Sequence, residues 1–173
     1  MSDLFLDEPN KKYQKSFENY VLIYKKHDPY YFNLYEEALK DFNKYINDLY
    51  DNSKGKNVPQ NWVPTSTFWL IDEDEVVGVV RIRHQEIESA GHIGYDISPY
   101  YRNQGYGTLI LKLALIKAAR LGIDEAILTC SINNIASKNI IENNNGVLIG
   151  TVFDEEENEN LYRFRIQTTN SFK

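Results

Sequence analysis

One short segment of this sequence is both basic and punctuated by glycine, and an apolar helical pattern begins directly after it. It consists of Arg102, Asn103, Gln104, Gly105, Tyr106, Gly107 and Thr108. Backbone N–H groups at a helix N-terminus lack partners and carry a partial positive charge, so they attract phosphate. Gly105 and Gly107 remove the Cβ atoms that would hold a diphosphate off the backbone, and Arg102 adds a full positive charge. The segment therefore predicts an anion site built from main-chain N–H groups.

Three other phosphate-binding patterns can be tested against this loop. A P-loop ends in Gly-Lys-Ser/Thr, whereas Gly107 is followed by Thr108 and Leu109 with no lysine. The dinucleotide fingerprint needs a third glycine where Ile110 stands. The kinase loop joins two strands, whereas a helix is expected here. What remains is Arg-x-x-Gly-x-Gly between a strand and a helix, which on its own is equally compatible with an ordinary turn.

A strand and a helix are expected to position the loop. His92 to Ile97 alternates polar and apolar residues as a strand does, and Pro99 ends it because proline cannot donate to a ladder. From about Gly105 the apolar period changes to 3.6. The predicted buried stripe of this helix is Leu109, Leu113 and Ile116, with Ile110 and Ala114 beside it. Gly122 closes the helix where a left-handed residue is favoured.

The patterns along the rest of the chain predict an α+β protein with one mixed sheet. The expected order is strand 4–6, helices 11–26 and 32–49, strands 67–71, 76–84 and 92–97, a helix from about 105, strand 126–130, a helix from 133 or 134 to about 144, and strands 146–153 and 161–167. The helical crossover makes 126–130 parallel to 92–97. The acidic run 154–159 is expected to be a solvated turn.

Composition and charge limit the class of protein. With 173 residues, of which 42% are hydrophobic and 25% charged, the chain is expected to form one globular domain over residues 1–173. The single cysteine, Cys130, excludes an internal disulfide and a cysteine-rich metal site, and we expect no metal. A net charge of −6 argues against nucleic acid and mildly favours a cationic partner. The most apolar segment, 109–119, is too short to cross a bilayer. The start has no signal-peptide pattern, so we expect a cytoplasmic protein without a membrane partner.

Two further parts of the chain have a recognisable form. Asn134-Ile135-Ala136-Ser137 is followed by Ile140-Ile141-Glu142-Asn143-Asn144, and the chain also contains V-P-T-S-T-F-W-L-I-D, I-R-H and G-H-I-G-Y. Together with the Arg-x-x-Gly-x-Gly loop and the order of elements, these stretches resemble the GNAT superfamily of N-acetyltransferases. They look most like a bacterial group of predicted acetyltransferases whose acceptor is unassigned. The resemblance is strong over about residues 63–150 and elsewhere rests on element order.

This resemblance implies a GNAT fold, in which a mixed central sheet of about six to seven strands is flanked by four helices and two central parallel strands splay apart. It implies a first part, 1–60, with one strand and two acceptor-side helices, then a cofactor-binding core at 63–150 and a C-terminal hairpin at 146–173. Tyrosines of the first two helices are then expected as an aromatic wall of the acceptor pocket or as ordinary core packing. These are Tyr24, Tyr30, Tyr31 and Tyr35. A monomer or a homodimer is expected.

The resemblance also implies acyl-CoA, most often acetyl-CoA, as the co-substrate. The loop from Arg102 to Thr108 would hold the pyrophosphate through N–H groups from Gln104 onward. Main-chain groups of Ile97 and Ser98 would meet pantetheine, and by analogy with the family the Ile97 N–H is the candidate oxyanion donor. Asn134 and Ser137 would meet the cofactor arm, although Asn134 is equally suited to capping its helix.

Amide formation needs a neutral amine, an acceptor for its proton and stabilisation of the oxyanion. His84 and His92 are predicted at facing ends of adjacent strands, and Glu86 and Glu88 lie in the turn between them. Each is therefore a candidate base. Ordinary hydrogen-bonded residues at the ends of a sheet are the simpler interpretation of both histidines, so the sequence leaves the base unassigned.

The usual acid of the family is missing. Many relatives carry a tyrosine seven residues beyond the asparagine of the second motif, where it protonates the leaving thiolate, and this position is Ile141. Either another group supplies the proton or the thiolate leaves unassisted, which a thiol pKa of about 8.5 tolerates. Cys130 is expected as a small buried residue and not as a nucleophile. Asp96 is expected on the opposite face of the sheet from Ile97, because strand residues alternate.

The leading interpretation is an acyl-CoA-dependent N-acetyltransferase. It would transfer an acyl group, expected to be acetyl, to a primary amine of a small molecule, peptide or protein by direct attack in a ternary complex. The missing tyrosine slightly favours an alternative, a non-catalytic acyl-CoA-binding module. A third interpretation, a nucleotide-binding regulatory domain, predicts protection against heating by ATP or NAD in place of CoA.

Overall fold

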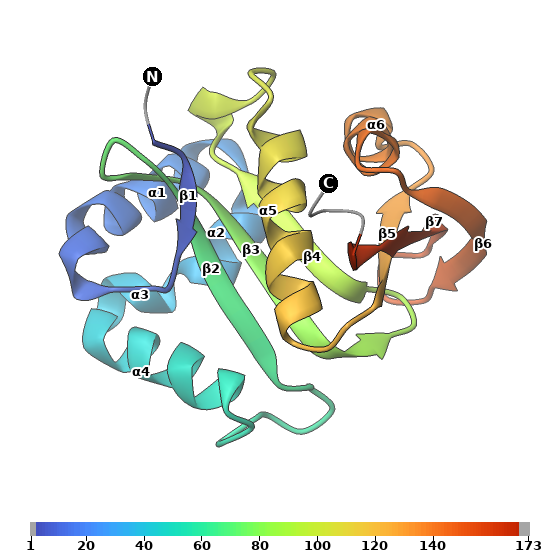
Figure 1. The fold of residues 1–173 in the computed structure, drawn as a ribbon. Helices are drawn as coiled ribbons and strands as arrows, with labels where there is room; N and C mark the ends of the chain where they lie inside the picture. The colour runs from blue at the N-terminus through green and yellow to red at the C-terminus, as the bar shows by residue number, and fades with distance from the viewer. Residues whose placement is uncertain (1–2, 170–173) are drawn as a thin grey trace.

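The computed structural model describes residues 3–169, and within them it contains seven strands and six α-helices (Figure 1). In chain order these are β1 (Phe5–Asp7), the 3-10 helix η1 (Lys11–Tyr13), α1 (Gln14–His27), α2 (Pro29–Tyr35), α3 (Glu37–Lys40), α4 (Phe42–Ser53), β2 (Thr65–Asp72), β3 (Glu75–Ile87), β4 (Gly91–Ile97), the 3-10 helix η2 (Pro99–Tyr101), α5 (Tyr106–Arg120), β5 (Glu125–Ser131), α6 (Ile135–Asn143), β6 (Val147–Asp154) and β7 (Glu159–Gln167). The prediction of an α+β fold is confirmed.

The strands form two antiparallel sheets, ordered β1-β2-β3-β4 and β5-β7-β6. Helices α1 to α4 cover one face of the first sheet, α5 crosses its other face, and α6 lies beside the second sheet (Figure 1). The sequence predicted one mixed sheet. In the structure β4 and β5 are neighbours without a ladder between them, so the two sheets meet at these strands.

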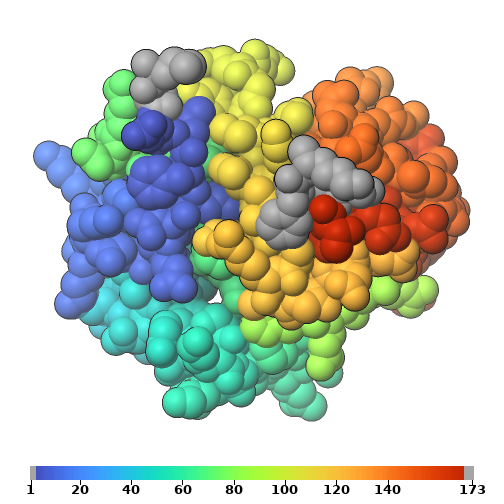
Figure 2. Space-filling view, viewed as in Figure 1, coloured from blue at the N-terminus to red at the C-terminus, as the bar shows by residue number. Residues whose placement is uncertain are grey.

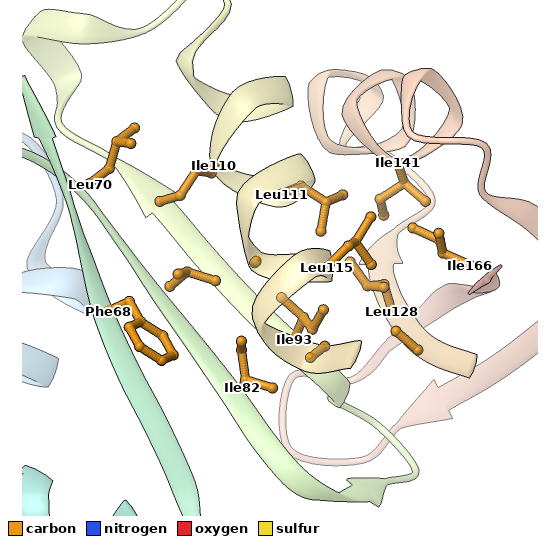
Figure 3. Close-up of a cluster of buried hydrophobic side chains, with 14 of the residues drawn as sticks. Phe68, Leu70, Ile82, Ile93, Ile110, Leu111, Leu115, Leu128, Ile141 and Ile166 are labelled. Carbon is orange, nitrogen blue, oxygen red and sulfur yellow. The ribbon is translucent and has the colours of Figure 1, made fainter. Parts of the chain in front are cut away.

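Each face of the first sheet has its own core. On the α5 face, aliphatic side chains of β3 and β4 pack against α5 and continue to Leu128, Ile141 and Ile166 of the second sheet and α6 (Figure 3). The opposite face is aromatic, and there the Phe17 and Trp69 rings stack with centroids 4.2 Å apart. The first core therefore joins the two sheets, while the second holds the N-terminal helices.

Two details of the helices differ from the prediction. The buried residues of α5 are Ile110, Leu111, Ala114, Leu115 and Ala118, so the buried stripe is centred one position away from the predicted one. The helix predicted over 32–49 is divided among α2, α3 and α4. Its second break lies at Asp41, whose backbone is extended and whose side chain accepts from the Lys44 N–H as the cap of α4. Apolar spacing continues across this break, which explains why periodicity alone missed it.

The two sheets approach each other most closely at the start of β4, here called the closed end of their junction. Gly91 and His92 make this approach possible. A Cβ atom at Gly91, where φ is +62°, would lie 2.2 Å from the Ile127 carbonyl oxygen, so only glycine allows the strands to approach this closely. The Ile127 N–H donates to His92 Nδ1 at 2.9 Å, and the Thr129 hydroxyl donates to the Ser89 carbonyl at 2.8 Å. Side chains thus replace the first rungs of a parallel ladder. No helix in residues 3–169 is long and apolar enough to span a membrane.

Candidate functional site

The N-terminus of α5 presents a row of open backbone N–H groups. Gly105 precedes the helix with φ +87°, and no side chain caps this end. The first helical bond runs from the Leu109 N–H to the Gly105 carbonyl at 3.2 Å. Over residues 3–169, no hydrogen bond is formed by the N–H groups of residues 104–108. The helix end therefore has the donors, and their direction, that an anion requires.

The two glycines of this loop serve different purposes. A Cβ at Gly105 would meet nothing within 4 Å, so the space beside the helix end is open, as predicted. A Cβ at Gly107 would lie 2.5 Å from Ile140 Cδ1 of α6. Gly107 therefore allows α5 and α6 to pack closely, a reason that the sequence did not suggest. Tyr106 anchors the loop by donating to Asp72 Oδ2 at 2.6 Å, and this hydrogen bond, with burial, raises the pKa of Tyr106 to about 12.

Strand register turns the main-chain groups of Ile97 toward β5. The Ser98 N–H donates to the Val77 carbonyl, so the Ser98–Val77 pair is hydrogen-bonded and the Ile97–Gly78 pair is not. The N–H and C=O of Ile97, and likewise of Tyr95, then point away from β3. The Ile97 carbonyl accepts from Tyr24 Oη and Arg102 Nε, both at 3.0 Å, whereas its N–H donates to no group in the described chain. An unpaired N–H thus lies on the free edge of β4, close to the loop.

Beyond its closed end, the junction between the sheets is bridged by side chains. β4 and β5 diverge toward their C-terminal ends (Figure 1). There Tyr95 Oη lies 3.1 Å from Ser137 Oγ of α6, and Ser137 also approaches the Cys130 thiol. Burial raises the pKa of Tyr95 to about 12 and also raises the pKa of Cys130, so both side chains stay protonated at neutral pH. Asn134 caps α6 by accepting from the Ser137 N–H at 3.0 Å.

A buried polar network lies on the other face of β4. The Asp96 side chain is 1% exposed and accepts hydrogen bonds from the hydroxyls of Tyr20, Tyr24 and Tyr35 and from Arg81 Nη1 at 3.0 Å. Burial raises the pKa of each of these phenols, so all three remain donors. The expectation that Asp96 faces away from the Ile97 side is correct. Its role in tying α1 and α2 to the end of β4 was missed.

Three of the four predicted bases, His84, His92 and Glu86, make contacts away from the Ile97 amide. His84 is six residues along β3 from Gly78, the partner of Ile97, or about 20 Å at the rise of a strand. It lines a hollow of about 360 Å³ between α4 and the C-terminal end of α5 (Figure 2), where its Nε2 is 2.8 Å from Ser66 Oγ. Glu86 pairs with Arg163 at 2.6 Å. His92 holds β5, as described, and Glu86 lies near enough to act on the pKa of His92, whereas His84 faces a separate hollow, so the three do not form one site.

Two features of the sequence could have indicated the buried network around Asp96: the alternation of arginines on β3 and the spacing of tyrosines on α1. Arg81 and Arg83 lie on either side of Ile82, directly after the apolar run 76–80, and this alternation places both on the face covered by α1 and α2. Tyr20 and Tyr24 are four residues apart on α1 and so share one helix face with a common target. Among residues 3–169, no group of histidine, cysteine, aspartate and glutamate side chains could hold a metal ion.

A sequence profile of the acetyltransferase (GNAT) domain matches residues 23–146, which is most of the chain. The chain belongs to the GNAT acetyltransferase family. No curated protein sequence matches it significantly. Solved GNAT structures resemble it throughout. The ribosomal L7/L12 α-N-protein acetyltransferase RimL, in complex with coenzyme A disulfide-bonded to one of its cysteines, has a TM-score of 0.70 at 18% identity, over 95% of this chain and 93% of that one.

Two further GNAT structures extend this comparison. The microcin C7 self-immunity acetyltransferase MccE, in complex with acetyl-CoA and AMP, has a TM-score of 0.72 at 15% identity, over 95% of this chain and 92% of that one. A chimera of the spermidine N-acetyltransferase SpeG from Vibrio cholerae and hSSAT has a TM-score of 0.61 at 16% identity, over 98% of each chain. At such identities these similarities establish the GNAT fold and leave the acceptor open.

The position where many GNAT relatives carry a tyrosine is a buried isoleucine in this chain. Ile141 is fully buried in the core, and a Cβ on Gly146 would lie 2.4 Å from its side chain. No larger side chain fits there without displacing the turn after α6. The phenol that reaches α6 from the open end of the junction is Tyr95, which comes from β4.

Proposed function

We propose that this GNAT protein transfers an acyl group, expected to be acetyl, from acyl-CoA to a primary amine of a small molecule or peptide, with residues 1–173 acting as one domain. The observation that carries this proposal is the uncapped N-terminus of α5 beside the free Ile97 amide. One site binds an anion and the other lies on an unpaired strand edge. An extended thioester carrier with a diphosphate at one end needs both.

The residues around these two sites support binding of acyl-CoA. The N–H groups from Gln104 to Thr108 would hold the pyrophosphate, with Arg102 and Asn103 beside them, in the open space at Gly105. Ile97 and Ser98 would meet the pantetheine arm. The Ser98 hydroxyl oxygen supports this assignment, because it is buried and has no partner in the described chain. Asn134 and Ser137 would border the arm from α6.

The chemistry that acyl-CoA supplies is an activated thioester carbonyl. In our proposal the Ile97 N–H donates to the carbonyl oxygen as negative charge develops on it. His84, His92 and Glu86 remain the base candidates by residue type, but each already makes a structural contact, and His84 and His92 lie well along the sheet from Ile97. These distances support loss of the amine proton through water.

We assign the proton donor for the departing sulfur to Tyr95. Its phenol supports this role because it points toward α6, where the usual tyrosine is replaced by Ile141, and because a pKa of about 12 keeps it protonated at neutral pH. The proton given up would return from the amide nitrogen through water, so the protein is unchanged after each cycle. Ser137 would hold the phenol in position.

The experiment that tests this function measures two quantities on the same protein. Release of free thiol from acetyl-CoA is followed with a panel of amines, and CoA binding is measured by calorimetry. We expect binding together with thiol release that depends on the amine. CoA binding without turnover on any amine would support the second candidate, a non-catalytic acyl-CoA-binding module, which the buried Ile141 favours. Absence of CoA binding would contradict both functions.

A further inference from the structure

Two arginines converge on one point at the acceptor face of β4. Arg81 and Arg83 lie on β3, beside Gly94 of β4. A Cβ atom built on Gly94 would lie 3.5 Å from Arg81 Nη2 and 3.5 Å from Arg83 Nη2. Glycine thus leaves room for about one methyl-sized group between β4 and the two guanidinium groups. The structure therefore places two positive charges side by side over Gly94, where all three residues are partly exposed.

The charges of this pair are only half compensated. Asp96 binds Arg81 at 3.0 Å and is itself saturated by three phenols. Within residues 3–169, the one hydrogen bond of Arg83 runs from Nη1 to the Ala90 carbonyl at 3.1 Å, and Arg83 pairs with no carboxylate. The acidic side chain nearest in the strand, Glu86, is bound to Arg163.

Because Arg83 is partly buried, the absence of a carboxylate partner destabilises its charged form. Burial, followed by the charge of Arg81, lowers the pKa of Arg83 to about 10, and Tyr30 acts in the opposite direction. Charged groups removed from water are stable when an opposite charge meets them. Arg83 is nevertheless partly open to solvent, so a ligand can reach it. A bound anion would supply the charge that the chain does not.

Aromatic side chains of α2 line the approach to this pair. Tyr30 is 65% exposed, and its ring meets Tyr31 edge-on at 5.1 Å. Tyr31 in turn stacks on Tyr35, whose ring lies 5.9 Å from the Arg81 guanidinium carbon. Tyr35 belongs to the buried network, whereas Tyr30 and Tyr31 are open enough to border a ligand. The predicted aromatic wall is thus divided between core packing and this approach.

The distance from the pair to the reacting end defines the ligand. Gly94 and Ile97 are three residues apart on β4, or about 10 Å at the rise of a strand. We propose that Arg83, supported by Arg81, binds an anionic group of the acceptor, a carboxylate or a phosphate, so that the amine at the other end of a short chain reaches the thioester near Ile97. This inference rests on the proposed acyl transfer and reverses the expectation of a cationic partner drawn from the net charge.

Matched acceptors test the inference directly. Thiol release at saturating acetyl-CoA is compared for γ-aminobutyrate, aminopropylphosphonate, butylamine and putrescine, which share a similar length and differ in charge. A charge-assisted bond to a guanidinium predicts kcat/KM for an anionic amine at least about 10-fold above butylamine, with putrescine lowest. The better of the two anionic amines identifies carboxylate or phosphate. Equal rates for all four amines, or a preference for putrescine, would overturn the inference.

Three variants distinguish the loss of the positive charge from a disturbance of the fold. Arg83→Gln should remove the preference for the anionic amines by lowering their kcat/KM to about that of butylamine. Gly94→Ala keeps both charges and makes only ordinary contacts, so it should fold and still weaken anionic amines by filling the space. Arg120→Gln, on the exposed C-terminal turn of α5, is the control and should change nothing. An unchanged preference in both Arg83→Gln and Gly94→Ala would refute the site.

Binding without chemistry distinguishes this inference from the proposed function. If no amine is acetylated, calorimetry with aminopropylphosphonate and γ-aminobutyrate in the presence of CoA still tests the pair. Binding to the wild type that is lost in Arg83→Gln would support an anionic ligand on a non-catalytic protein. No binding of either compound would overturn the inference, whatever the result for turnover.

Discussion

Gly105 and Gly122 form a natural pair of test positions at the two ends of α5. Their φ angles are +87° and +85°, and a Cβ atom at either would meet nothing within 4 Å. Aspartate at each position should therefore cost a similar amount, about 1–2 kcal/mol for a left-handed backbone. Only Gly105→Asp adds a carboxylate beside the open amides. We expect CoA binding to be lost in Gly105→Asp and retained in Gly122→Asp, as measured by calorimetry.

One result would contradict the proposed binding of diphosphate by this loop. Equal CoA affinity in Gly105→Asp and Gly122→Asp would mean that the α5 amides hold no diphosphate. Gly107 is a poorer position for this test, because a side chain there meets Ile140 at 2.5 Å and would disturb the packing of α6. Loss of binding in a Gly107 variant would then have two explanations.

Tyr95 can be tested by removing one oxygen atom. If its hydroxyl protonates the departing sulfur, Tyr95→Phe should lower kcat by about 100-fold, the low end for a general acid, because a thiolate is a good leaving group. Ser137→Ala, which removes the partner at 3.1 Å, should have a smaller effect. The KM for acetyl-CoA should stay unchanged in both. A loss that appears only in KM would assign Tyr95 to binding.

At the scale of elements, the Asp96 network joins α1, α2, β3 and β4. Removing its carboxylate leaves the Arg81 charge buried without compensation, so Asp96→Ala should lower the free energy of unfolding by about 3–5 kcal/mol. Asp48→Ala breaks the exposed pair with Lys44 and should change it by less than about 1 kcal/mol. Urea denaturation of both variants measures the difference. Similar values for the two would show that the network contributes little to stability.

His92 makes the contact between the sheets dependent on pH. Burial is the main cause that lowers the pKa of His92 from its ordinary value of 6.5, with the Arg83 charge acting in the same direction and Glu86 against it. The folded protein therefore needs neutral His92, whose Nδ1 accepts from the Ile127 N–H. Stability from this contact is complete above about pH 6.5 and declines as pH falls through the lowered pKa.

A non-titrating replacement isolates this effect. Asparagine can present its oxygen where His92 presents Nδ1, so His92→Asn keeps an acceptor and loses the titration. We expect the free energy of unfolding to fall more steeply between pH 7 and pH 5 in the wild type than in His92→Asn. Parallel curves for the two proteins would show that His92 does not couple the sheets to pH.

Much of the architecture follows from sequence patterns, and the exceptions have local causes. Strand alternation and the glycine loop predicted β4, α5 and the turn at Gly122. The break at Asp41 was missed because apolar spacing continues across it, and only the capping residue marks it. The contacts that join β4 to β5 at the start of β4 were missed, because Gly91 and His92 meet Ile127 only in three dimensions.

The main-chain groups of the candidate site could be anticipated from the sequence, whereas contacts between distant side chains could not. The loop before α5 carries its own glycines and arginine, so open amides at this helix end could be anticipated, although the spacing alone was equally compatible with an ordinary turn. The Asp96 network brings together four elements, and no local pattern ties Tyr20 or Tyr35 to that carboxylate. Arg83 and Gly94 likewise meet only through strand register. Contacts between side chains that come from different strands can be recognised only in a structure.

For the whole molecule, a carrier bound between the sheets should act as an added cross-link. We expect acetyl-CoA at about 100 times its Kd to stabilise the protein by about 2.7 kcal/mol. Hydrogen exchange should slow at the amides of Ile97 and residues 104–108, and at the N-terminus of α6. ATP and NAD are the controls. Equal protection by either would support a nucleotide-binding regulatory domain instead.

In our proposal β4 binds the carrier through its main-chain edge and borders the acceptor with one face, so its two tasks depend on different chemical groups. Its edge offers peptide groups, which are nearly identical for every residue type except proline. Gly94 and the Asp96 side chain instead face α1 and α2, on the side where Arg81 and Arg83 lie. In the proposed transferase, exchanging the residue at position 94 or 83 should therefore change which amine is chosen without weakening the binding of acyl-CoA. In such a strand, acceptor choice and carrier binding would depend on different atoms.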